Sequence, residues 1–163
     1  MQARSIRVPG PDHPITITPN PARVTVSLAG RIIADTREAL TLREASYAAV
    51  QYIPRKDVVM SLLQRTDHST YCPYKGACAY YSIPSGGARS TNAVWTYEAP
   101  YAAVAEIKDH LAFYPDRVDE IKEQSSNDAS EGRYAILEAN PLAQFGDGPM
   151  FIEYTVSSLD AVL

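Results

Sequence analysis

The sequence predicts a small, mainly β (α+β) domain in which antiparallel strands form a two-sheet barrel or sandwich capped by one helix. Three observations carry this prediction. Short segments alternate apolar and polar residues at the two-residue period of a half-buried strand. Turns rich in glycine and proline separate these segments. Only one longer segment, at about 101–112, places apolar residues at helical spacing.

The strand candidates share β-favouring residues and nearby turn signals, and they are residues 23–28, 31–35, 39–43, 47–53, 77–83 and 92–98. The first two are expected to form a hairpin, because Gly30 suits the positive φ of a tight turn after Ala29. The last two are expected to form a second hairpin. Pro54 should end the fourth candidate, because proline has no amide donor for the ladder.

Two segments are expected to be helical. Residues 55–63 place apolar side chains at the spacing of one or two helical turns. The capping helix is expected to follow Pro100, because a proline in the first turn costs no hydrogen bond there. Pro115 should stop it.

The chain is long enough for one domain, which we place at residues 15–122. Residues 1–14 contain three prolines without any period and are expected to form an extended arm. Residues 123–163 are expected to be a polar linker and tail. The linker is clearest at 123–132, which has no large apolar residue, and the alternating segment 151–156 could add one strand.

The formal charge of −4 and the pI of about 5.3 argue against a nucleic-acid partner, which usually needs a basic surface. No membrane partner is expected, because no run of about 18 consecutive apolar residues is present. The N-terminus lacks the apolar core of a secretory signal, so the cytoplasm is the expected location. Cys72 and Cys78 are too few for a disulfide framework and are expected to be thiols.

Residues 67–76 (DHSTYCPYKG) form the segment most suited to chemistry, and we expect a polar, irregular loop there. The catalytic candidates are His68, Cys72 and Lys75. The imidazole of His68 belongs to a class of side chain that titrates near neutral pH, and His68 or Lys75 could activate the Cys72 thiol by lowering its pKa. On an extended chain Thr70 would share one face with His68 and Cys72. The alternative is structural: His68 makes a hydrogen bond and Cys72 is a small buried apolar residue.

Two other interpretations concern bound ions. Lys75 and backbone amides could hold an anion, with Arg55 adding a bidentate contact, although the full phosphate-loop pattern is absent. His68, Cys72 and Cys78 have the spacing H-x3-C-x5-C, which lacks the paired cysteines usual at zinc sites. We therefore expect no metal and no cofactor.

The sequence has 11 tyrosines but only three phenylalanines and one tryptophan. Tyrosine suits pocket walls because it has an apolar body and a polar tip. Tyr80 is expected in such a wall, and the ligand-binding candidates are Tyr47, Tyr52, Arg55, Thr70, Tyr74, Gly76, Trp95 and Tyr97. The alternative is ordinary packing of tyrosines between strands.

The run at 67–76 resembles the bacterial and fungal domain of unknown function family number 427, which is also labelled nucleotidyltransferase-like. The supporting segments occur in matching order at 24–35, 52–58, 95–101, 112–114 and 116–118. The resemblance covers roughly residues 13–120 and implies a tent-like fold, with two antiparallel sheets meeting at an angle. Zinc does not carry over, because the chain lacks the C-x-x-C pairs of tent-like zinc proteins. Nor does it have the glycine-serine loop and acidic pair that metal-dependent nucleotide transfer needs.

Two classes of function follow. In the first, an unknown small polar or anionic molecule binds between the sheets against Trp95 and the tyrosines, with His68 as an acid or base and Lys75 and Arg55 on an anionic group. In the second, the domain is a protein-interaction module or a homodimer without catalysis. Whether the chain is an enzyme stays open at this stage.

Overall fold

The computed structural model describes residues 5–125, which contain ten strands and five short 3-10 helices. The strands are β1 (Ile15–Asn20), β2 (Arg23–Leu28), β3 (Arg31–Thr36), β4 (Ala39–Glu44), β5 (Val50–Pro54), β6 (Gln64–Cys72), β7 (Gly76–Ser82), β8 (Val94–Thr96), β9 (His110–Phe113) and β10 (Glu120–Gln124). The 3-10 helices are η1 (Arg55–Asp57), η2 (Met60–Leu62), η3 (Pro84–Ser90), η4 (Ala102–Ile107) and η5 (Pro115–Arg117). None of the helices in this part of the chain is long and apolar enough to span a membrane.

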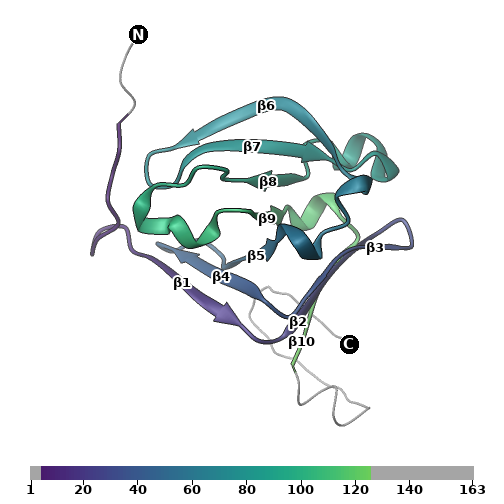
Figure 1. Cartoon of the computed structure of the whole chain (residues 1–163), viewed down its shortest axis with the longest axis horizontal. Coiled ribbons are helices and arrows are strands. Elements are labelled where there is room, and N and C mark those ends of the chain that lie inside the picture. The colour runs from purple at the N-terminus through teal and green to yellow at the C-terminus, as the bar shows by residue number, and fades with distance from the viewer. Residues whose placement is uncertain (1–4, 126–163) are drawn as a thin grey trace.

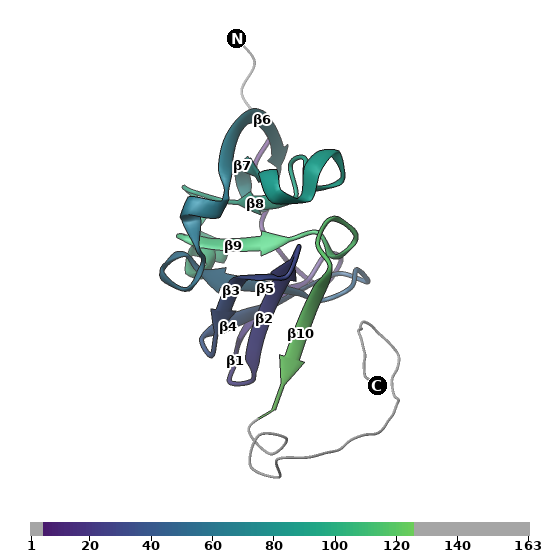
Figure 2. The same cartoon turned by 90° about the vertical axis from the view of Figure 1, so that its right-hand side faces the viewer.

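The strands form two antiparallel sheets, as predicted, and the sheets stay open rather than closing into a barrel (Figure 1). The larger sheet has seven strands in the order β1-β4-β5-β9-β8-β7-β6, and the smaller has the order β10-β2-β3. Figure 2 shows β2 and β10 running across the direction of β9. This arrangement agrees with the tent-like fold that the resemblance implies.

Both predicted hairpins are confirmed. Strand β2 pairs with β3 across Ala29 and Gly30, which have φ values of 54° and 76°. Positive φ at both central residues gives the turn the twist that a two-residue hairpin needs. Strand β7 pairs with β8, as the segments 77–83 and 92–98 predicted.

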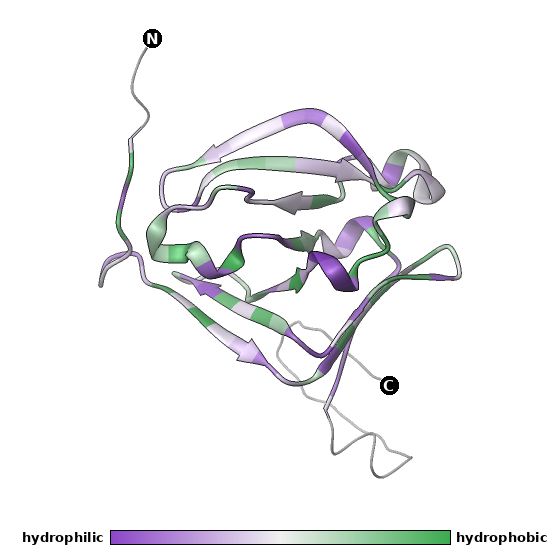
Figure 3. Cartoon of the chain, viewed as in Figure 1, coloured by the Kyte–Doolittle hydropathy of each residue, from purple (hydrophilic) through white to green (hydrophobic). Residues whose placement is uncertain are grey.

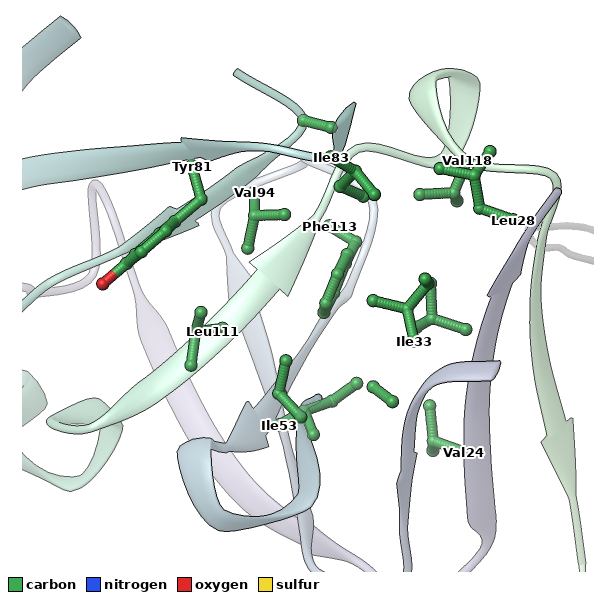
Figure 4. Packing of buried hydrophobic residues seen from close by; sticks show 14 of the residues in the cluster. Val24, Leu28, Ile33, Ile53, Tyr81, Ile83, Val94, Leu111, Phe113 and Val118 are labelled. Carbon is green, nitrogen blue, oxygen red and sulfur yellow. The ribbon is translucent and has the colours of Figure 1, made fainter. Parts of the chain in front are cut away.

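The main core lies between the two sheets (Figure 4). Successive strand residues point to opposite faces, so β2 directs Val24, Val26 and Leu28 inward while the residues between them stay partly exposed. On the seven-stranded sheet, Leu111 and Phe113 face this core. Burying each such side chain stabilises the fold by about 1.5–3 kcal/mol.

The opposite face of the seven-stranded sheet carries a second apolar cluster, which includes Tyr52, Cys78, Tyr80 and Ala112. Strand β9 shows how one strand serves both clusters, because Ala112 faces this second cluster while its neighbours face the first. The central strands are therefore apolar on both faces, which suits strands buried on both sides.

The predicted capping helix at about 101–112 is confirmed in its position, but its predicted length is wrong. Only η4 is helical there, its backbone is broken at Val104, and Asp109 takes a φ of 62° before β9 begins. Val104 and Ile107 are both fully buried, so the apolar spacing was real but served a short 3-10 segment. Residues 110–113 form β9, which pairs with β5 and β8, and this pairing overrides the local helical pattern.

The predicted irregular loop at 67–76 is also wrong. Strand β6 continues to Cys72, and Gly76 already begins β7. Strand β6 is the edge of its sheet, so its polar side chains lie in solvent, and Figure 3 shows hydrophilic residues along much of it. An edge strand needs no alternating apolar face, and a register shift between Arg65 and Ser69 interrupts its pairing further.

The remaining segments differ from the predictions in smaller ways. Residues 55–63 form the two 3-10 turns η1 and η2. Strand β5 begins at Val50, three residues later than expected. Strand β10 includes Glu123 and Gln124, which the sequence placed in the linker. The strand expected at 151–156 lies outside the described residues.

Candidate functional site

A cavity of about 230 Å³ opens on the second face of the seven-stranded sheet. Its lining is mostly aromatic and consists of Leu42, Glu44, Tyr47, Ala48, Val50, Tyr52, Lys75, Tyr80, Trp95, Tyr97 and Tyr114. Alternation along the strands explains the set, because Leu42 and Glu44 on β4, and Val50 and Tyr52 on β5, are two residues apart. The volume is below the ~300–1,000 Å³ usual for drug-sized ligands, so the cavity suits a small molecule.

Hydrogen bonds and ring contacts connect the aromatic residues of the wall to one another and to Thr70. The indole Nε1–H of Trp95 donates to the Tyr52 hydroxyl at 3.1 Å, and the two rings meet edge to face with centroids 6.3 Å apart. Trp95 also contacts Tyr114, at a centroid distance of 4.5 Å. The Tyr80 hydroxyl shares a 2.8 Å hydrogen bond with Thr70. These contacts order the rings that a ligand would touch.

Three tyrosine hydroxyls of this wall are held in their neutral form. Burial raises the pKa of Tyr52, Tyr80 and Tyr97 far above the ordinary value of 10.0. Burial also raises the pKa of the Cys78 thiol beside them. The wall therefore offers neutral hydroxyls for hydrogen bonding, and the Cys78 thiol has little of the thiolate character that reactivity requires.

One rim of the cavity carries a charged cluster. The Glu44 carboxylate, at the end of β4, accepts hydrogen bonds from Lys75 Nζ and, at 2.7 Å, from His13 Nε2. The side chains of Lys75 and Glu44 are only 9% and 14% exposed. Burial opposes ionisation of Glu44, but its two partners outweigh burial, so the pKa of Glu44 lies below its ordinary value of 4.5.

The backbone fixes Lys75 at this rim. Its amide N–H donates to the Cys72 carbonyl, which closes the turn between β6 and β7. Its carbonyl accepts from the Tyr101 N–H, which joins this turn to the segment before η4. The ammonium lies 5.8 Å from the centre of the Tyr97 ring, so an aromatic face and a carboxylate surround it.

Five of the predicted site residues line the cavity, and they are Tyr47, Tyr52, Lys75, Trp95 and Tyr97. Tyr80, expected in the aromatic wall, lines it as well. Three more lie just outside: His68 packs its ring 4.5 Å from that of Tyr80, Thr70 bonds the same tyrosine, and Cys72 packs against the second apolar cluster. Within residues 5–125, no hydrogen bond joins His68 to Cys72.

The other predicted residues lie elsewhere. Tyr74 stacks on His13 and lines a separate cavity of about 330 Å³ beside the N-terminal arm. Gly76 has a φ of 112° and serves the turn. Arg55 donates to the Tyr81 hydroxyl on the opposite face of the sheet, so the structure does not bring it to Lys75.

The residues missed by the sequence are Glu44, His13 and Tyr114. Glu44 continues the alternation of Leu40 and Leu42, a signal that could have placed it on the same face. His13 and Lys75 each lie 31 positions from Glu44, and no local pattern links them. In the described part of the chain, no group of three or more His, Cys, Asp or Glu residues is placed to bind a metal ion.

Comparison with protein families agrees with this architecture. The model of the family described as "Domain of unknown function (DUF427)" matches residues 16–124, which span all ten strands except the first residue of β1. The chain belongs to this family. The resemblance carried by the motif at 67–76 is therefore confirmed. No curated protein matched the DUF427 chain, so its function has to be argued from the cavity itself.

Proposed function

We propose that this DUF427 domain binds a small molecule consisting of a ring with a polar or anionic group, in the aromatic cavity on the outer face of the seven-stranded sheet. The observation that carries this function is the meeting of aromatic rings with one buried ion pair. A mostly apolar wall with a few placed polar groups is the usual composition of a ligand site.

The two parts of the cavity have complementary roles. The faces of Trp95 and its neighbouring tyrosines would cover the ring of the ligand, and the neutral hydroxyls would satisfy its polar edge. Lys75 and Glu44 would orient the ligand from the rim. Acid–base chemistry by His68 has less support, because its ring lies against Tyr80 rather than among the lining residues.

Trp95 provides the test, because it is the only tryptophan in the chain and lines the cavity. Its fluorescence would be followed while single-ring compounds, charged and uncharged, are added, and native mass spectrometry would identify any molecule that copurifies. Tyr47 is 67% exposed at the rim, so Tyr47→Ala should leave the fold intact and weaken binding about tenfold.

Ile32→Ala is the matched control, because Ile32 is a 51% exposed residue on the smaller sheet. This variant should bind as tightly as the unmodified chain. If no compound alters Trp95 emission and nothing copurifies, or if Tyr47→Ala binds normally, the cavity is not the ligand site.

A second candidate function is self-association, which the exposed apolar side chains of the arm favour. Ile6 and Val8 lie in solvent on an extended segment whose Arg7 N–H donates to the Pro73 carbonyl. Sedimentation velocity should then report a dimer that Ile6→Ser with Val8→Ser dissociates. A monomer at high concentration would exclude this function.

A further inference from the structure

The ammonium of Lys75 has unused hydrogen-bonding capacity in an enclosed place. An ammonium carries three N–H donors. Among residues 5–125, Glu44 is the only acceptor hydrogen-bonded to Lys75 Nζ. The side chain is 9% exposed, so water has limited access to the remaining donors. A nearly buried charge with free donors facing a cavity favours an acceptor supplied by a ligand.

The charge of the Lys75 ammonium is balanced by the Glu44 carboxylate. A ligand anion that shares the ammonium weakens the attraction between the ammonium and its carboxylate, and a buried carboxylate without a partner is costly. Glu44 avoids this state, because His13 Nε2 bonds its second oxygen at 2.7 Å. An ionised carboxylate only accepts hydrogen bonds, so His13 donates its Nε2–H here.

Contacts other than the one with Glu44 hold His13 in place, and none of them involves the Lys75 side chain. The imidazole stacks on Tyr74 with centroids 4.0 Å apart and planes 5° from parallel. The His13 N–H also donates to the Gly10 carbonyl, and the Arg7 N–H ties the arm to the turn before Lys75. His13 can therefore keep its bond to Glu44 while Lys75 also binds a ligand.

We propose that the ligand of the cavity carries a carboxylate-sized anionic group that binds the free donors of Lys75, and that His13 is the positioning residue that keeps Glu44 paired while the ligand shares the ammonium. This inference rests on the proposed function and adds the charge of the ligand and a role for the arm. Cationic ligands are disfavoured, because Glu44, the only acidic residue that lines the cavity in the described part of the chain, already has two partners.

Matched acid and amide probes test the charge. Benzoate and cyclohexanecarboxylate would be titrated against benzamide and cyclohexanecarboxamide, with Trp95 fluorescence and calorimetry as readouts. Each acid should bind about tenfold more tightly than its amide, as expected when the ammonium pairs with a carboxylate instead of a neutral carbonyl.

Variants on the arm test the role of His13. His13→Ala should lower the affinity for the acids about tenfold and leave that for the amides within about twofold, while His13→Gln, which keeps an N–H donor, should restore part of it. Asp12→Asn is the control, because Asp12 precedes His13 and lines the neighbouring cavity. Melting temperatures would confirm that each variant is folded.

The outcomes are separable. Equal binding of acids and amides, or a preference for amides, would overturn the anionic ligand and leave the proposed function standing. A preference for acids that survives His13→Ala would overturn the positioning role. If none of the four probes binds and no molecule copurifies with the protein, the inference fails together with the proposed function.

Discussion

Removing the carboxylate of Glu44 should destabilise the domain more than removing the ammonium of Lys75, although both belong to the same ion pair. Glu44→Gln leaves a 9% exposed ammonium without a carboxylate partner among the described residues. Lys75→Met leaves Glu44 paired with His13. The thioether side chain also keeps an apolar stem of similar length to that of lysine.

The magnitudes follow from these environments. Breaking a buried pair costs about 3–5 kcal/mol when one charge is stranded, and we expect about 3 kcal/mol for Glu44→Gln because the amide oxygen still accepts a hydrogen bond. For Lys75→Met we expect about 1.5 kcal/mol, since one charge-assisted hydrogen bond is lost and Glu44 keeps a partner. The double variant should resemble Lys75→Met, because it contains no unpaired ammonium.

Urea unfolding at pH 7, followed by Trp95 fluorescence, measures these differences. With a slope of about 1.5 kcal/mol/M, the midpoint should fall by about 2 M for Glu44→Gln and about 1 M for Lys75→Met. Glu98→Gln is the control, because Glu98 pairs with Arg65 at the surface and should contribute less than about 1 kcal/mol. If Lys75→Met destabilises as much as Glu44→Gln, His13 does not compensate Glu44 and the reasoning is refuted.

Three further predictions concern stability. Because the pKa of Glu44 is lowered in the folded protein, its ionisation adds stability that is fully present above pH 4.5 and is lost as the pH falls through the folded-state pKa. In urea titrations between about pH 5 and pH 3, Glu44→Gln should therefore lose less stability than the unmodified chain. An identical loss would contradict this prediction. Gly76→Ala should cost about 1–3 kcal/mol in thermal unfolding because of its φ of 112°, whereas Gly10→Ala, in open space, should be neutral; equal melting temperatures would show that the turn adapts. Leu111→Ala should cost about 2–5 kcal/mol by the same assay, against little change for the exposed Val59→Ala, and a small effect would mean that the core closes over the missing side chain.

Local patterns were sufficient for several elements of the fold. The alternation of β2 and the Ala29–Gly30 turn specify a hairpin without help from the rest of the chain. The same logic predicted the pairing of β7 with β8, and it placed Tyr52 and Trp95 among the candidates that line one cavity. Such features depend on the backbone preferences and side-chain directions of a few neighbouring residues, so they can be predicted from a short stretch of sequence.

Other elements depended on partners far away in the chain. Strand β9 lies between β5 and β8, and this pairing placed the last residues of an apparent helix in a strand. Strand β6 was misjudged because an edge strand needs no apolar face, so its polar residues resemble those of a loop. Propensity is a weak prior, and pairing within a sheet readily overrides it.

The candidate site divides in the same way. The sequence by itself determined that this DUF427 chain has a two-sheet β domain and aromatic residues on alternating strand positions. Only the tertiary structure decided that Arg55 faces away and that His13 and Lys75 meet on Glu44 from opposite directions along the chain. Alternation tells which face a side chain occupies, but the group opposite it is set by the register and order of strands, which are long-range properties of the fold.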